Sequence, residues 1–166
     1  MVDPRDATQE VEDRYGLDED SNPNHLGRLL GFFVPQRLAR RGIEVTVETG
    51  RDRYAAGEDV TVRIEFRNRL PVPVTVRTPT PRLWGWSVNG HLEASDEPRR
   101  RLSGGDGSQL PFRSRERKRI VRRWDGRIKR VGEPTRWERV TGEVDIRAFL
   151  AVDGSQPADV TTVRLD

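Results

Sequence analysis

The stretch Tyr54–Val76, YAAGEDVTVRIEFRNRLPVPVTV, decides the fold of this chain. Apolar side chains alternate with polar ones from Val60 to Phe66, and the alternation returns from Val72 to Val76. Alternation of period two is typical of strands that bury one face, and a short proline-marked connection between two such runs favours a hairpin. The stretch therefore predicts two paired antiparallel strands, Val60–Arg67 and Val72–Arg77.

The chain after residue 42 repeats these signals at short intervals. Asn89-Gly90 supplies the residue pair that a type I′ hairpin demands, and Asp125-Gly126 and Asp153-Gly154 mark two more turns. Short strands separated by such turns indicate an all-β fold over residues 43–166, an immunoglobulin-like antiparallel β-sandwich of 7–8 strands. Further strands are predicted at Ile43–Val47, Trp84–Val88, Leu110–Phe112, Arg117–Trp124, Val144–Val152 and Thr161–Leu165.

The first 42 residues divide into two other segments. Residues 1–23 show no sustained apolar period and are predicted to form an acidic disordered arm. Residues 24–42 are predicted to form an amphipathic helical segment that is interrupted at Pro35 and closed by Gly42 as a left-handed cap. The candidate docking face of this helix has i, i+3, i+4, i+7 spacing and consists of Leu26, Leu29, Leu30 and Phe33.

Three surfaces can accept this apolar face. The favoured interpretation is that it covers an open end of the sandwich, because apolar stripes are usually buried. It can also bind a partner protein, as amphipathic helices do in grooves. Binding to an anionic membrane surface is the least favoured interpretation, since the stripe is short and interrupted.

The composition excludes several classes of protein. Hydrophobic residues make up 33% of the chain and charged residues 34%, so the core must be thin. The absence of cysteine excludes disulfides, a thiolate nucleophile and Cys-ligated zinc. No apolar run approaches the roughly 20 residues of a transmembrane helix, and no signal-peptide pattern is present. We therefore expect a soluble cytoplasmic protein.

Three motifs carry a resemblance to a known family. They are the run Glu58–Asn68 followed by Pro73–Val76, the turn Trp124-Asp125-Gly126, and the strand Gly142–Leu150. Through them, residues 43–166 resemble the BsuPI-type intracellular proteinase inhibitor domain, and the segment Trp84–Gly90 is similar to small immunoglobulin-like proteins of halophilic archaea. The resemblance implies an immunoglobulin-like fold, with proteinase inhibition as one inherited activity. The motifs are structural, so they transfer no inhibitory residue.

The sequence offers little material for catalysis. His25 and His91 are its only histidines, and neither has a partner at metal-ligand spacing. The glycine-rich run 104–107 lacks the Lys-Ser/Thr of a phosphate-binding loop. We predict no catalytic residue, no metal site and no cofactor, and therefore no enzyme.

A dense basic series is the strongest candidate binding region. Trp124 and Trp137 lie near it in the sequence, and phosphate binding with aromatic stacking uses such residue types. The alternative is an edge strand protected by charge, with Lys118 and Arg122 among its inward residues and Trp124 in the core. The candidate partner or nucleic-acid contacts are Arg99, Arg100, Arg101, Arg119, Arg122, Arg123, Arg127, Lys129 and Arg130.

Two functions follow from the sequence. The first is a non-catalytic, immunoglobulin-like protein-binding or regulatory module, which includes the proteinase-inhibitor possibility. The alternative is a basic RNA- or ribosome-associated protein that uses the region 99–130. The sequence specifies neither the partner nor the oligomeric state.

Overall fold

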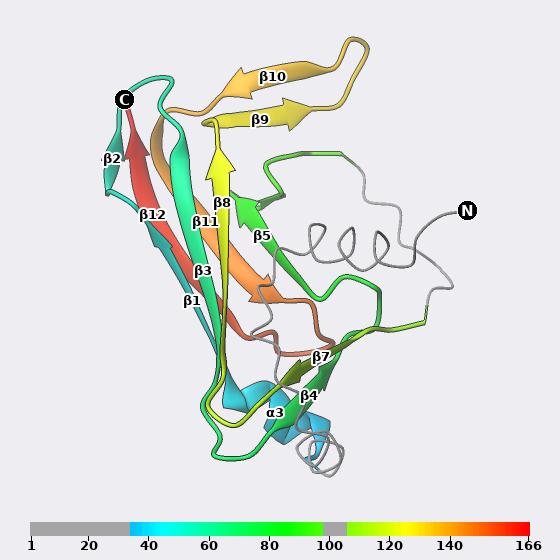
Figure 1. Cartoon of the computed structure of the whole chain (residues 1–166). Helices are drawn as coiled ribbons and strands as arrows, with labels where there is room; N and C mark the ends of the chain where they lie inside the picture. The colour runs from blue at the N-terminus through cyan, green and yellow to red at the C-terminus, as the bar shows by residue number, and fades with distance from the viewer. Residues whose placement is uncertain (1–33, 98–105) are drawn as a thin grey trace, which may run out of the picture.

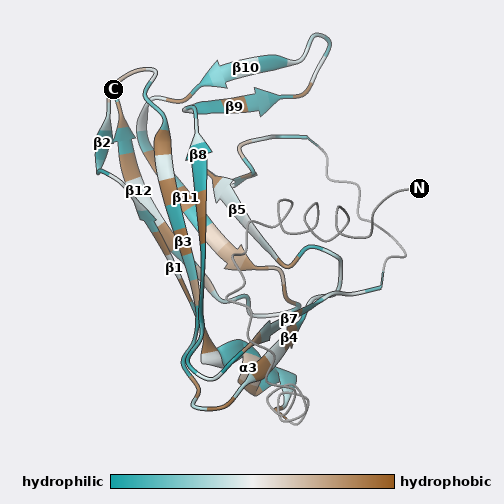
Figure 2. Ribbon diagram, in the orientation of Figure 1, coloured by the Kyte–Doolittle hydropathy of each residue, from teal (hydrophilic) through white to brown (hydrophobic). Residues whose placement is uncertain are grey.

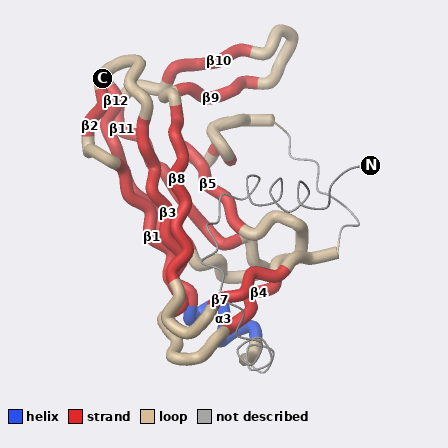
Figure 3. The backbone as a smooth tube through the Cα atoms, in the orientation of Figure 1, coloured by secondary structure: helices blue, strands red, loops and turns tan. Residues whose placement is uncertain are grey.

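The computed structural model describes residues 34–97 and 106–166. Within these ranges, one short helix precedes twelve strands (Figure 3), which confirms the all-β prediction. The helix is α3 (Gln36–Gly42), and the strands are β1 (Ile43–Thr49), β2 (Arg53–Tyr54), β3 (Val60–Asn68), β4 (Val74–Arg77), β5 (Trp84–Val88), β6 (His91–Leu92), β7 (Gln109–Phe112), β8 (Arg117–Trp124), β9 (Arg127–Arg130), β10 (Arg136–Arg139), β11 (Gly142–Leu150) and β12 (Ala158–Leu165).

Most strands belong to two larger sheets. One has the order β1-β3-β8 and is antiparallel throughout. The other has the order β2-β12-β11-β5-β6, in which the short β2–β12 pair is parallel and the remaining pairs are antiparallel. The pairs β4–β7 and β9–β10 form two smaller sheets, which lie at opposite ends of the molecule (Figure 1).

The two larger sheets contribute to a single hydrophobic core. Alternate residues of β3 from Val60 to Phe66 are at most 1% exposed, whereas the residues between them are partly or fully exposed. Figure 2 shows the matching change of hydropathy along the strand. Alternate residues of β11 from Val144 to Leu150 are fully buried in the same cluster. Trp124 joins them from the end of β8 with 3% of its surface exposed, as its inward position predicts.

The predicted pairing of Val60–Arg67 with Val72–Arg77 is wrong. In the structure, β3 pairs with β1 and β8, whereas β4 pairs with β7. The physical reason is Asn68, whose fully buried side chain organises the connection as a loop. Its Nδ2 donates to the carbonyl oxygens of Val72 and Arg113, both at 2.8 Å, and its Oδ1 accepts from the amide of Leu70 at 3.0 Å. The chain therefore leaves the β3 sheet instead of folding back along it.

The other turn predictions agree with the structure. Asn89 and Gly90 have φ angles of 46° and 82°, the positive values that a type I′ turn needs between β5 and β6. The strand predicted at Leu110–Phe112 is present as β7, with both of those side chains buried. Strand β10 was not predicted, because all four of its residues are exposed and it shows no apolar alternation.

The predicted left-handed cap at Gly42 is also wrong. Gly42 is the last residue of α3, and β1 starts at the next residue. A Cβ at this position would lie 2.6 Å from Cδ1 of Leu70, so a larger residue here requires the Leu70 side chain to move. The candidate docking face at Leu26–Phe33 and the arm at 1–23 lie outside the described residues.

Candidate functional site

The structure distributes the predicted basic residues over two elements. Arg119 and Arg123 point outward from β8, and Arg122 lies on its inward side together with buried Lys118, as the alternation predicts. Arg127, Lys129 and Arg130 belong to β9. Arg99, Arg100 and Arg101 lie outside the described residues. The prediction of an edge strand for Arg117–Trp124 is confirmed, since β8 ends the order β1-β3-β8.

Several of these basic side chains are engaged within the chain itself. Arg119 Nε lies 2.7 Å from a carboxylate oxygen of Glu65, and Arg117 approaches the same carboxylate at 3.7 Å. On β9, Lys129 pairs with Glu97 at 3.0 Å, and Arg130 pairs with Glu138 at 2.7 Å. A phosphate backbone would have to compete with these carboxylates, which weakens the case for nucleic acid.

The side chain of Arg122 contacts an aromatic ring within the fold. Its guanidinium carbon lies 5.2 Å from the ring centroid of Trp84, within the range of a cation–π interaction. Arg122 Nη1 also donates to the carbonyl oxygen of Val121 at 3.1 Å. We therefore assign Arg122 to packing between β8 and β5.

A first prediction tests the restraint that Glu65 exerts on β8. Replacing Glu65 with glutamine removes the carboxylate that Arg117 and Arg119 share, so both guanidinium groups become available to a polyanion. We expect Glu65→Gln to elute from immobilised heparin at higher salt than Glu143→Gln, which removes the same charge from exposed β11 surface. Equal elution would show that the ion pairs do not limit polyanion binding.

The strands β9 and β10 form a two-stranded ribbon that is held to the body along β9. The amide of Lys129 donates to Ala94 O at 2.8 Å, and Lys129 O accepts from the amide of Asp96 at 3.0 Å. Ile128 is 3% exposed, and the indole N–H of Trp124 donates to Arg127 O at 2.7 Å. Strand β9 is therefore paired on both sides, which leaves β10 as the outer strand.

Trp137 distinguishes the β9–β10 ribbon from the rest of the surface. Its exposed fraction is 59%, against 8% for Trp84, 9% for Trp86 and 3% for Trp124. It stands opposite Lys129 in the register of the two strands, and Arg139 stands opposite Arg127. The alternation along each strand puts these four side chains on one face of the ribbon.

The sequence placed Trp137 near the basic series but gave it no strand and no orientation. Its signal was weak, because the run Arg136-Trp137-Glu138-Arg139 has one apolar residue among three charged ones. Val131, just after β9, is a second exposed apolar side chain beside the ribbon, with an exposed fraction of 46%. Trp137 was therefore not among the candidate contacts predicted from the sequence.

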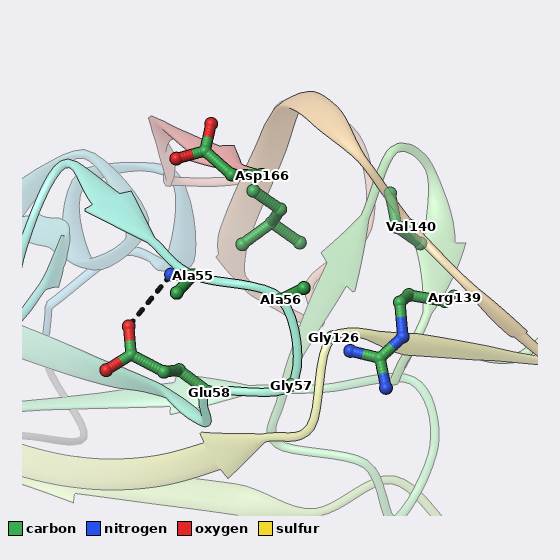
Figure 4. A pocket seen from close by; sticks show the side chains of 9 residues that line it. Ala55, Ala56, Gly57, Glu58, Gly126, Arg139, Val140 and Asp166 are labelled. Carbon is green, nitrogen blue, oxygen red and sulfur yellow. Dashed lines mark hydrogen bonds between the residues drawn. The ribbon is translucent and has the colours of Figure 1, made fainter.

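A small pocket lies where the base of the ribbon meets the body (Figure 4). Its cavity volume is about 10 Å³, room for about one water molecule. Arg139 lines it together with Gly126, Asp166 and the turn at residues 55–58. The pocket is too small for an organic substrate.

Glu58, at the rim of this pocket, has a local structural role. The backbone amide of Ala55 donates to its carboxylate at 2.8 Å, and Arg51 contributes a second hydrogen bond at 3.2 Å. These two contacts lower the pKa of Glu58 from its ordinary value of 4.5. The ionised carboxylate closes the turn at residues 55–58 and is a poor general acid.

Two kinds of site are absent from the residues that the structure describes. Residues 34–97 and 106–166 contain no group of three or more histidine or acidic side chains that could hold a metal ion. No helix in those ranges is long and apolar enough to cross a membrane.

Comparison with known proteins identifies the family. Residues 31–166 match the model of a family described as a family of unknown function (DUF7974). The chain belongs to this family. No curated protein matches its sequence.

Several solved structures are similar to the chain at low identity. The CARDB domain of a Pyrococcus furiosus protein in complex with di-metal ions has 13% identity and a TM-score of 0.44, covering 75% of this chain and 87% of that one. An alkylpurine DNA glycosylase from Pseudomonas fluorescens, bound to DNA, has 10% identity and a TM-score of 0.44, covering 84% and 33%. A Listeria innocua beta-glucosidase has 11% identity and a TM-score of 0.43, covering 74% of this chain and only 16% of the enzyme. None of their activities is transferred to this chain.

Proposed function

We propose that this chain is a non-catalytic protein-binding module that engages its partner through the β9–β10 ribbon. The observation that carries the proposal is Trp137, a large aromatic side chain that is 59% exposed on a strand with no buried residue. Tryptophan and arginine dominate the energetic centres of protein interfaces, and here the opposed pair Arg127 and Arg139 comes next to Trp137 on the same face of the ribbon. A buried tryptophan stabilises the core, whereas a tryptophan that is largely exposed adds little to the stability of the fold. The exposure of Trp137 is therefore better explained by binding than by folding.

The strand order supports an immunoglobulin-like sandwich as the scaffold of this module. The orders β1-β3-β8 and β12-β11-β5 correspond to strands A-B-E and G-F-C of such sandwiches. In that correspondence, β8 is strand E and β11 is strand F, so the ribbon is an insertion in the E–F connection. Binding residues are often carried by connections that a rigid sandwich positions.

Charge favours a protein over nucleic acid as the partner. Residues 125–139 hold five basic and three acidic residues, a mixed set with a net charge of +2. Nucleic-acid surfaces are more uniformly positive. Proteinase inhibition, which the resemblance implies, is one form that such protein binding could take.

Affinity isolation from source-cell extract, with and without nuclease, tests the class of partner. We expect the full chain to retain a protein that survives nuclease treatment, with an affinity that falls only modestly as salt rises. Loss of all retained material after nuclease, together with a steep salt dependence, would instead assign the ribbon to RNA.

A further inference from the structure

We propose that an extended acidic segment of the partner protein adds as a strand to the outer edge of β10. This inference rests on the proposed function and specifies its binding mode. Strand β10 ends the two-stranded order β10-β9, and all four of its residues are exposed. Its outer edge therefore presents backbone N–H and C=O groups to which an extended peptide can pair.

The charges on the ribbon select an acidic occupant. Arg127, Arg136 and Arg139 form no ion pair with any of the residues that the structure describes. A second copy of the chain would bring another ribbon with the same excess of positive charge, five basic against three acidic residues over 125–139, and this repulsion disfavours it as the occupant. An acidic segment has the opposite charge and meets no such repulsion.

The alternation along β10 also sets the pattern of the occupant. Trp137 and Arg139 lie on one face of the ribbon, and Arg136 and Glu138 lie on the other. Arg130 already pairs with Glu138 at 2.7 Å, which leaves Arg136 as the available charge on that second face. An added strand with apolar residues toward Trp137 and acidic residues toward Arg136 would contact the tryptophan on one face and pair with the arginine on the other.

The test uses a synthetic peptide of about ten residues in which glutamate and valine alternate, a length that covers the edge with overhang. Binding to the full chain is followed through acrylamide quenching of tryptophan fluorescence. Trp137 is by far the most exposed of the four tryptophans, so a bound strand should reduce the quenching. The matched control peptide carries lysine in place of glutamate.

We expect the lysine peptide to bind about tenfold more weakly than the glutamate peptide, and Arg136→Glu to reverse that preference. Two further peptides are N-methylated, one on every glutamate amide and the other on every valine amide. Because alternate amides of a strand point to opposite edges, one of these peptides should bind and the other should not.

The outcomes separate this inference from the proposed function. If no peptide protects Trp137, or if both N-methylated peptides bind, strand addition is wrong. The proposed function survives that result when Trp137→Ala still abolishes capture of the partner protein. If an oligouridylate protects Trp137 while the acidic peptide does not, the ribbon binds nucleic acid and both proposals are wrong.

Discussion

Replacing Asn68 with alanine should destabilise the protein by about 3–5 kcal/mol, because three buried hydrogen bonds are lost at once. The side chain is fully buried, and the carbonyls of Val72 and Arg113 and the amide of Leu70 would lose their partner. Marginal stability of roughly 5–15 kcal/mol makes this a large fraction of the total. Urea denaturation would measure this loss. The midpoint concentration of urea should fall, and the dependence of the free energy of unfolding on urea concentration should stay the same.

Gln36→Ala is the matched control for this substitution. Gln36 also bonds to the backbone through both atoms of its amide, at 2.8 Å to Thr75 O and at 3.0 Å from the amide of Arg77. It is only partly buried, so water can replace those bonds, and we expect a cost of about 1 kcal/mol or less. An equal cost for the two substitutions would contradict the role given to Asn68.

Replacing Trp124 with alanine should also destabilise the protein by about 3–5 kcal/mol, the usual cost of truncating a buried aromatic side chain. The ring is 3% exposed, and its indole N–H holds Arg127 O at the start of β9. Thermal unfolding would report the loss. The substitution should also loosen the ribbon, which amide hydrogen exchange at β9 would show as faster exchange.

Trp137→Ala is the corresponding control for stability. It removes the same side chain from an exposed position, so we expect a change within about 0.5 kcal/mol. A large loss of stability from Trp137→Ala would mean that this ring supports the fold, and it would remove the reason to assign it to binding.

Much of the fold was predictable from local pattern. Apolar alternation was sufficient to predict β3, β8 and β11, and the pair Asn89-Gly90 was sufficient to predict a turn. Both features depend only on residues that are close in the sequence. The partner of β3 was not predictable in this way. Asn68 bonds to Arg113, 45 residues along the chain, and no local pattern reports such a contact.

The candidate site was predictable in composition but not in arrangement. The basic residues were evident, yet Glu65 lies 54 residues from Arg119 and becomes its partner only through the β3–β8 register. The same limit applies to Trp137, since exposure depends on what the fold leaves uncovered. Strand β10 has one apolar residue, so it shows no apolar alternation from which a strand could be predicted.

The scaffold and the exposed ribbon of this molecule consist of different residues. The sheets around β3 bury their apolar faces, and the outer arginines of β8 neutralise Glu65, so these residues serve the fold. The β9–β10 ribbon extends from that scaffold with β9 paired on both sides and β10 paired on one. In the proposed function, partner binding is concentrated on this ribbon at Trp137.

The most direct test compares the affinity of the captured partner for the full chain, for Trp137→Ala and for Val160→Ala. Val160 is 50% exposed on β12, in the five-stranded sheet, and serves as the control for an exposed apolar side chain away from the ribbon. We expect Trp137→Ala to weaken binding by about thirtyfold or more, as truncation of an interface centre does, and Val160→Ala to leave it unchanged. Unchanged affinity in Trp137→Ala, with the fold intact, would contradict the placement of the binding centre at Trp137.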